Sequence, residues 1–505
     1  MKSKIHGAVT AGHEKTAEAA IIAFDAGGNA FDAAVAALLA SFVAEPLMSS
    51  AAGGGFMTGY SADHKPMVFD FFCQTPSGKR PIDEIDFYPI QVQFGATEET
   101  FHIGMGSMAV PGNMAGVFKI HEEMGSIPLE ILAEPALKMA KEGILVNNFQ
   151  NYEFKLLEPI ISVPENAKRI FYREGKIIEK NTKFQMPHFV DLLEVLLIEG
   201  KTLFYQGEVA QKVVADNESS GGFLSLQDFK NYHVIIRDPL SIQHNDNHIY
   251  TNPPPSTGGA LIALCFQLLA QTKKLYKAES QEALLQLIQI LRQVEKVRFD
   301  EEKFLGFQKS LNYGINVESN LGSSNLGSTT NVSIMDSLGN ALAVTVSNGQ
   351  GAGYMIPETD VMMNNMLGEG ALFPNGFHSW QPDSRVSSLM SPTVLTGEAG
   401  PEAVLGTGGA GRIPFSIVQV LHNIIDHKLD YDAAIENSRV YLEKGVLNVE
   451  PGYGEMENLP PGISEIIRWE KPDMFFGGVN TVAKTGNELK GIADHRREGV
   501  VMYTA

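Results

Sequence analysis

The chain has 505 residues, of which 44% are hydrophobic and 19% are charged, so its composition is that of a globular protein and excludes the disordered and fibrous classes. Its formal net charge is −20, and because no lysine- or arginine-rich stripe could follow a phosphate backbone, we expect no nucleic-acid partner. We interpret the acidity as a solubilising surface rather than as a field that steers cationic substrates.

The two cysteines, Cys73 and Cys265, form no metal-ligand spacing, and a chain of this length needs no disulfide bonds to fold. We therefore expect no disulfide, no metal and no other cofactor. Residues 1–16 contain no apolar run of signal-peptide length, and no stretch of about eighteen apolar residues occurs anywhere in the chain. These observations predict a cytoplasmic protein without a membrane partner. The length leaves the number of domains open, because layered folds often exceed the typical domain length as one unit.

Two helices are predicted within residues 17–45. Apolar side chains recur there at spacings of three and four residues, and Gly27 and Gly28 interrupt the pattern. The second helix carries little charge, which predicts burial on most of its faces. The glycines of the next segment, residues 49–57, indicate positive φ angles or close backbone packing, and without a following lysine they do not form a phosphate loop.

The clearest helical pattern lies between Ser280 and Phe304, where leucine, isoleucine and valine recur at helical spacing opposite charged residues. Residues 311–328, in contrast, are rich in Asn, Gly and Ser and show no periodicity. This composition predicts an exposed loop.

The pattern changes abruptly at Thr329. Apolar and polar residues alternate over residues 332–334 and again over residues 342–346, on either side of a turn at residues 336–340, which predicts a β-hairpin. A flexible loop that runs into a strand beginning with threonine is the local context of an N-terminal nucleophile, because cutting the loop leaves the threonine at a strand tip. On pattern alone, threonines before a strand more often reflect β-propensity.

Segments spread along the chain resemble, in the same order, the motifs of the γ-glutamyltranspeptidase family. The family's opening is matched by GAVTAGHEKTAEAAIIAFDAGGNAFDAAVA and EPLMSSAAGGGFM, its middle by VPGNMAGVFKIHEEMG and PALKMAKEGILV, and its approach to the cleavage site by NPPPSTGGALI. Its nucleophile hairpin is matched by STTNVSIMDSLGNALAVTVS, its substrate loops by MNNM and SSLMSPTVL, its oxyanion turn by GTGGAGRI, and its close by GIADHRREG. Mainly residues 150–220 and 265–325 lack such motifs.

The resemblance implies an α+β fold, the four-layered αββα sandwich of the N-terminal nucleophile hydrolases. It also implies a precursor that is cut between Ser328 and Thr329 into a large subunit, residues 1–328, and a small subunit, residues 329–505, which stay intertwined as one structural domain. The hydroxyl group of Thr329 would attack first the Ser328 carbonyl, in an N-to-O acyl shift, and later the amide of a small-molecule substrate. The freed α-amine, with an ordinary pKa of about 7.7 to 8.0, would act as general base.

The resemblance assigns three further catalytic residues. Gly409 and Ala410 would offer backbone N–H groups to the oxyanion, each worth roughly 3 to 4 kcal/mol. Ala410 stands where the family has glycine, a change that is mild at negative φ and serious at positive φ. Ser347 replaces a family threonine that hydrogen-bonds the nucleophile, and it keeps the hydroxyl group. Without the resemblance, residues 408–411 would be interpreted as a loop that enters a helix.

The positions that would hold a γ-glutamyl group depart from the family pattern. Phe72 replaces the arginine that would pair with the α-carboxylate, and the family's two serines become Ser388 and Leu389. Met366 fills an amine-binding position, while Glu369 retains one carboxylate. Burying an α-carboxylate without its partner in such a pocket would cost several kcal/mol, so efficient γ-glutamyl transfer is not expected.

Three functions stay open. The favoured one is a self-processing threonine amide hydrolase or acyltransferase whose acyl pocket is less polar than one that binds γ-glutamate. The stretch between Glu369 and Ser388 is short, which implies that no lid covers the active site. Water would then reach the acyl-enzyme, so hydrolysis is expected rather than transfer. The second is an ordinary γ-glutamyl hydrolase or transpeptidase into whose pocket other cations reach, with the candidates Lys79, Arg80 and Arg385. The third is an unprocessed, catalytically silent homologue acting in binding, because Asn331 stands where a histidine usually follows the two threonines.

Overall fold

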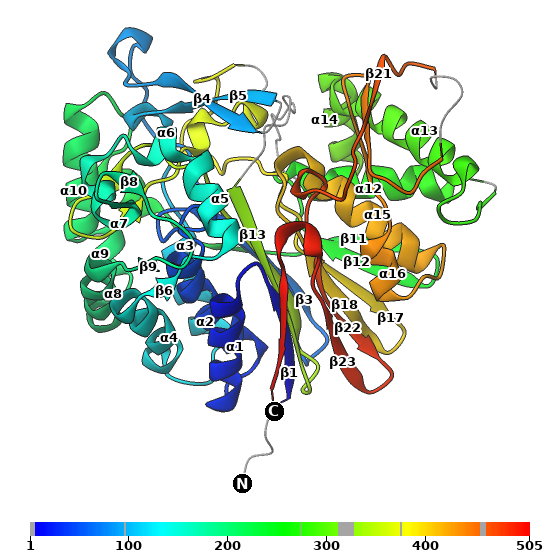
Figure 1. Cartoon of the computed structure of the whole chain (residues 1–505), viewed down its shortest axis with the longest axis horizontal. Helices are drawn as coiled ribbons and strands as arrows, with labels where there is room; N and C mark the ends of the chain where they lie inside the picture. The colour runs from blue at the N-terminus through cyan, green and yellow to red at the C-terminus, as the bar shows by residue number, and fades with distance from the viewer. Residues whose placement is uncertain are drawn as a thin grey trace.

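The computed structural model describes residues 6–94, 97–272, 274–311, 328–373, 376–454 and 461–504. Within these ranges two antiparallel sheets lie face to face, and helices cover the outer face of each sheet (Figure 1). This is the αββα sandwich that the resemblance implied. No helix of the described ranges is both long and apolar enough to span a bilayer.

The first sheet has seven strands, and every neighbouring pair is antiparallel. Its strands are, in spatial order, β10 (Ile235–Arg237), β3 (Pro66–Phe71), β2 (Gly54–Tyr60), β14 (Ala341–Gly349), β13 (Ser328–Asp336), β1 (Gly7–Ala11) and β24 (Val500–Tyr503). The predicted hairpin is confirmed as β13 and β14. It lies in the middle of the sheet, between β2 and β1, which come from the beginning of the chain.

The second sheet has six strands, also antiparallel throughout. They are, in spatial order, β11 (Leu240–His244), β12 (Asn247–Thr251), β17 (Thr393–Gly397), β18 (Gly400–Gly406), β22 (Asn480–Thr485) and β23 (Glu488–Ile492). Small apolar side chains from both sheets, including Ala8, Ala343 and Val404, form one buried cluster. Their small size lets the two sheets approach each other closely.

The helices that cover the first sheet include the two predicted near the start of the chain, α1 (Glu14–Asp25) and α2 (Ala30–Ala44). Every residue of α2 is buried, as its low charge predicted. Asn29 begins α2 with a capping box, since its side chain accepts hydrogen bonds from the first turn and Asp32 accepts one in return. The other long helices of this layer are α3 (Asn113–Met124), α4 (Leu129–Glu142) and α8 (Pro187–Glu199).

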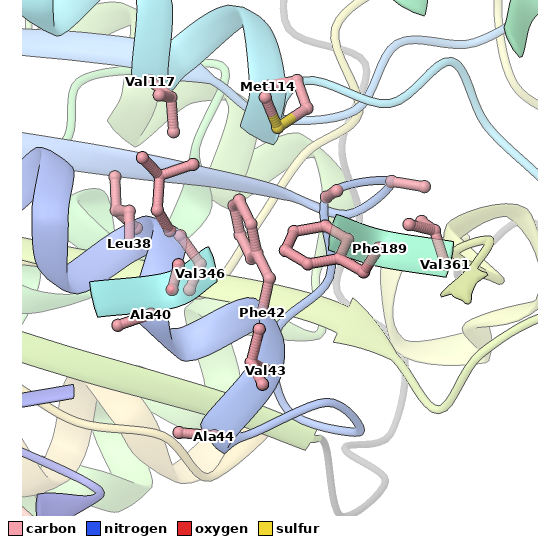
Figure 2. Close-up of a cluster of buried hydrophobic side chains, with 14 of the residues drawn as sticks. Leu38, Ala40, Phe42, Val43, Ala44, Met114, Val117, Phe189, Val346 and Val361 are labelled. Carbon is pink, nitrogen blue, oxygen red and sulfur yellow. The ribbon is translucent and has the colours of Figure 1, made fainter. Parts of the chain in front are cut away.

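The core of this layer is continuous between the helices and the sheet. Figure 2 shows part of it, where Leu38 and Phe42 of α2, Met114 and Val117 of α3, and Phe189 of α8 come together. Shorter elements surround this layer: the hairpin β4 (Tyr88–Phe94) and β5 (Thr97–Ile103), and the helices α5 (Asn148–Leu156), α6 (Glu158–Ile161), α7 (Lys168–Phe171), α9 (Thr202–Tyr205), α10 (Glu208–Ser219) and α11 (Leu226–Asn231).

The second helical layer contains α12 (Thr257–Ala270), α13 (Gln281–Arg298), α14 (Glu301–Ser310), α15 (Ile413–Ile425) and α16 (Tyr431–Glu436). The single helix predicted from Ser280 to Phe304 is wrong in extent. It is divided at Phe299 and Asp300, because the Asp300 side chain accepts a hydrogen bond from the backbone N–H of Lys303 and so begins a new helix. The predicted loop at residues 311–328 lies outside the described residues except for its two ends.

Candidate active site

Thr329 is the second residue of β13, at the end of the central hairpin. It lies opposite Ser347 of β14, and the pairing register shifts between Ser328 and Thr329. Ser347 pairs on its other side with Gly54 of β2, where an added Cβ would lie 2.7 Å from the backbone nitrogen of Cys73. The predicted glycine-rich segment therefore serves close backbone packing beside the threonine.

The Ser347 hydroxyl group contacts the bond that self-cleavage would break. Its Oγ donates a hydrogen bond to the carbonyl oxygen of Ser328 at 2.6 Å and accepts one from the backbone N–H of Gly349 at 3.1 Å. The resemblance implied a bond from Ser347 to the nucleophile. With the 328–329 peptide bond intact, the hydroxyl instead lies against the carbonyl that Thr329 would attack.

The turn at residues 408–410 lies against the same threonine. A Cβ added to Gly408 would be 2.1 Å from the carbonyl oxygen of Thr329, so the turn can approach this closely only with glycine. Gly409 has a φ of +129° and Ala410 a φ of +48°. The alanine is thus in the left-handed region, where a Cβ costs roughly 1 to 2 kcal/mol. The turn also leads directly into α15, so the interpretation as a helix-entry loop describes the same structure.

A pocket of about 430 Å³ opens beside Thr329. The structure brings nearly all the predicted site residues together around it: Thr329, Ser347, Ala410, Phe72, Met366, Glu369, Ser388 and Leu389. Gly409 and Ser328 precede lining residues but do not line the pocket themselves. The wall is completed by Gly349, Ala371, Leu372, Met390 and Ile413.

The pocket wall is largely apolar. Phe72, Met366 and Leu389 are all buried, and the ring of Phe72 stacks on Phe56 with the centroids 5.3 Å apart. The Ser388 hydroxyl is occupied within its own loop, where it accepts a hydrogen bond from the backbone N–H of Met390 at 3.1 Å. Among the described residues that line the pocket, none is cationic.

Glu369 is the one acidic side chain among those lining residues. Burial, aided by the nearby Glu99, raises the pKa of Glu369 from 4.5 to about 8, because the charged form loses its hydration. Its Oε1 has no hydrogen-bond partner within the described part of the chain. The carboxyl group is therefore mainly neutral at pH 7.

The three cations proposed to replace the missing arginine are held elsewhere. Arg385 donates to the backbone carbonyl groups of Phe72, at 2.6 Å, and of His233, at 2.7 Å. Lys79 donates to the carbonyl of His378 at 2.9 Å, and Arg80 to that of Glu218 at 3.0 Å. None of the three lines the pocket.

Sequence reasoning missed Arg497, which donates from Nη1 to the carbonyl oxygen of Thr329 at 3.3 Å. Burial, and secondarily the nearby Arg412, lowers the pKa of Arg497 to about 10. The signal was present in the closing motif GIADHRREG, whose paired arginines carried no assigned role. Its other arginine, Arg496, forms a buried ion pair with Glu450 at 2.6 Å and anchors the motif.

Asn331, which stands where the family usually has a histidine, finds hydrogen-bond partners inside the hairpin. Its amide lies between the hydroxyl groups of Thr345, at 2.8 Å, and Ser333, at 3.0 Å. Thr330, which precedes Asn331, forms a hydrogen bond with the Glu45 carboxyl group. That group also accepts a hydrogen bond from Thr16 at 2.6 Å. Asn331 is therefore accommodated within the strand, with its amide paired inside the hairpin.

Known proteins resemble this chain in sequence over most of its length. The family model described as Gamma-glutamyltranspeptidase matches residues 16–312 and 307–504. A glutathione hydrolase proenzyme of Escherichia coli (strain K12) is 28% identical over 471 residues, covering 85% of this chain and 80% of the relative. An acylase ACY 1 proenzyme of Pseudomonas sp. (strain V22) is 26% identical over 526 residues, covering 98% and 92%.

A solved structure resembles this fold over nearly the whole chain. The crystal structure of a cephalosporin acylase from Bacillus halodurans superposes with a TM-score of 0.81 at 21% identity, covering 99% of this chain and 96% of that chain. The likeness therefore extends over the complete sandwich.

Proposed function

The chain belongs to the γ-glutamyltranspeptidase family, and on this basis we propose that it is a self-processing threonine amide hydrolase whose acyl pocket takes a group less polar than γ-glutamate. Membership makes the protein an N-terminal-nucleophile amidohydrolase or acyltransferase. Self-cleavage, the hydrolytic outcome and the altered pocket are the parts we propose.

Self-cleavage begins with attack of the Thr329 Oγ1 on the carbonyl carbon of Ser328. The new C–O bond forms as the C–N bond between the two residues breaks, and the released amine takes up the proton of the hydroxyl group. Ser347 supports this step, since its Oγ–H is 2.6 Å from the oxygen on which negative charge develops. Water then hydrolyses the ester, which frees the Thr329 hydroxyl group and leaves a carboxylate on Ser328.

Turnover uses the same oxygen a second time. The free α-amine of Thr329 takes the proton from Oγ1, which attacks the substrate's amide carbonyl, and the departing amine receives that proton. The backbone N–H groups of Gly409 and Ala410 would stabilise the oxyanion. This role is supported by the contact of Gly408 with the Thr329 carbonyl and by Ala410 in the pocket wall. Water hydrolyses the acyl-enzyme, because the stretch between Glu369 and Ser388 is short in the sequence, which implies that no lid excludes it.

The observation that carries the proposed substrate class is the apolar wall beside the nucleophile. Phe72, Met366 and Leu389 line the pocket with Thr329, and no lysine, arginine or histidine of the described residues joins them. An α-carboxylate would be buried there without a counter-ion, at a cost of several kcal/mol. A neutral, mainly apolar acyl group meets no such penalty, and the similarity to acylases is consistent with it.

The first experiment tests the nucleophile. Wild-type protein should give two bands on a denaturing gel, the smaller with Thr329 as its first residue, whereas Thr329→Ala should stay at full length and lack amidase activity. A wild-type chain that stays intact after long incubation would reject self-processing and favour a silent binding protein.

The second experiment tests the pocket. Processed enzyme should hydrolyse a butyryl or phenylacetyl anilide with kcat/KM at least tenfold above that for the γ-glutamyl anilide. The matched variant Phe72→Arg with Leu389→Ser, which restores the family's residues, should shift this ratio towards the γ-glutamyl compound. Rapid, saturable turnover of the γ-glutamyl anilide by the wild type would show an ordinary γ-glutamyl enzyme instead.

A further inference from the structure

A second pocket, of about 660 Å³ including open space, is lined by residues of α3, α9, α11 and the segment that joins α11 to β10. This lysine pocket is lined by Ala115, Lys119, Lys201, Tyr205, Gln206, Lys230, Tyr232, His233 and Val234. It shares no lining residue with the pocket at Thr329.

The charge of the lysine pocket opposes that of the chain. Three lysines and one histidine line it, and no acidic residue does, although the chain has 59 acidic residues against 39 lysines and arginines. Lys119 is partly neutralised by Glu122, at 3.2 Å, and Glu123, at 2.5 Å. Lys201 and Lys230 form no ion pair within the described part of the chain. Their ammonium groups are available to an anion.

The floor of the lysine pocket is aromatic. The rings of Tyr205 and Tyr232 are nearly parallel, with centroids 5.6 Å apart and planes 11° apart. Both hydroxyl groups point into the protein, where Tyr205 donates to the carbonyl of Pro111 at 3.0 Å and Tyr232 to that of Phe72 at 2.8 Å. The two rings cover one another, and Arg385 lies over the Tyr232 ring at 4.8 Å, so the floor offers the pocket ring edges.

We propose that the lysine pocket binds a small organic anion. A phosphate or carboxylate group would lie between Lys201 and Lys230, and an apolar part would contact the ring edges of Tyr205 and Tyr232. Lysine acts as a point charge without the planar fork of arginine, so both anionic groups fit. Because the two lysines are exposed, the attraction is screened by salt, and the affinity falls as ionic strength rises.

The floor also connects this site to the catalytic one. The Phe72 carbonyl accepts hydrogen bonds from Tyr232, at 2.8 Å, and Arg385, at 2.6 Å, while its ring lines the acyl pocket. Tyr232 of the lysine pocket is thus hydrogen-bonded to a residue that lines the acyl pocket. Binding in the lysine pocket itself uses no group of the catalytic reaction, so it does not depend on the proposed substrate.

The proposal is tested by calorimetric titration of the purified full-length protein with phenyl phosphate, benzoate and inorganic phosphate at low salt. Phenyl phosphate or benzoate should bind at one site, at least threefold more tightly than inorganic phosphate, because only they have an apolar part that contacts the tyrosine edges. The double variant Lys201→Glu with Lys230→Glu should weaken this binding at least tenfold. The control Lys65→Glu with Lys180→Glu, two exposed lysines outside the pocket with the same change of net charge, should leave it within twofold.

The titration also distinguishes the two anionic groups, since preference for phenyl phosphate indicates a phosphate ligand and preference for benzoate a carboxylate. All four substitutions are at exposed positions, so melting temperatures should change little. Undiminished binding to the Lys201→Glu, Lys230→Glu variant would overturn the proposal, because it would show that the anion binds at another site. Absence of binding to the wild type, or equal affinity for inorganic phosphate, would overturn it as well.

Discussion

At the scale of single residues, the Ser347 hydroxyl group would take part in the proposed self-cleavage before it serves turnover. It lies 2.6 Å from the Ser328 carbonyl oxygen, whose negative charge grows as Thr329 attacks. Removing one such donor typically slows a reaction by about 10²- to 10³-fold. Ser347→Ala should therefore slow the appearance of the two fragments by about a hundredfold, as followed on denaturing gels.

The matched control for this prediction is Ser388→Ala. Ser388 is also a buried serine of the same pocket, but its hydroxyl contacts the backbone of Met390 and not the scissile carbonyl. It should leave the rate of cleavage within a few-fold of the wild type. Equal rates for Ser347→Ala and wild type would contradict the role given to Ser347.

Glu369 makes a pH-dependent contribution to stability. Its pKa is about 8 in the folded chain and close to 4.5 when unfolded, so between these values the folded state holds a proton that the unfolded state has lost. Stability from this group is therefore complete below pH 4.5 and decreases, by a few kcal/mol, as the pH rises to 8. Glu369→Gln lacks this dependence.

The difference in melting temperature between Glu369→Gln and the wild type should increase in favour of the variant from pH 5 to pH 8 and then level off. Thermal melts at several pH values in one buffer series measure it, and other titrating groups cancel because both proteins share them. A difference that is constant with pH would show that Glu369 is already ionised at pH 5.

Much of the pocket could be located from the sequence, because most of its predicted residues lie in short motifs that the family resemblance aligns. Phe72 and Leu389 are far apart in the chain, yet the resemblance assigns both to the acyl pocket and they line the same pocket. Arg497 also lies in such a motif, GIADHRREG, but the motif did not indicate what the side chain contacts. Its contact is with a backbone carbonyl of Thr329, and no side-chain pattern encodes a contact with the backbone.

At the scale of the elements, the turn at residues 408–410 is strained at one position. Ala410 has a φ of +48°, which glycine adopts without a steric penalty. Ala410→Gly should therefore stabilise the protein by about 1 kcal/mol and raise its melting temperature. We suggest measuring this in the Thr329→Ala background, where the chain stays in one piece.

The opposite change two residues earlier is the control. A Cβ at Gly408 would lie 2.1 Å from the carbonyl oxygen of Thr329, so Gly408→Ala should lower the melting temperature and displace the turn. If Ala410→Gly melts at or below the temperature of its parent, the strain assigned to Ala410 is not present in solution.

The elements that could be predicted are those with local periodicity. The alternation of apolar and polar residues after Thr329 predicted the hairpin β13–β14, since a period of two residues is visible within each strand. The division between α13 and α14 was missed because apolar spacing continues across it, and only the hydrogen bond from Lys303 to Asp300 reveals the new start. Periodicity thus predicted the type of each element more reliably than the residues at which it begins and ends.

At the scale of the whole molecule, the segments on either side of the 328–329 bond share both sheets. β13 and β14 lie between β2 and β1, and β24 follows β1 at the edge, so strands of the two segments alternate. In the second sheet β12, from the first segment, pairs with β17, from the second. This interleaving followed from the family resemblance alone, because composition and periodicity carry no information on strand order. A cytoplasmic location remains a prediction from the sequence.

This interleaving predicts that the products of cleavage stay together. Separating residues 329–505 from the rest would break the backbone pairing of β13 with β1 and of β14 with β2, and it would expose the buried cluster between the sheets. After cleavage, both fragments should therefore elute in one native gel-filtration peak of the same size as the Thr329→Ala chain, and they should separate only in denaturant. Light scattering at the peak gives the mass, and the gel bands give the composition. Fragments that elute apart in native buffer would show that residues 6–311 and 328–504 form separable units, contrary to the shared sheets.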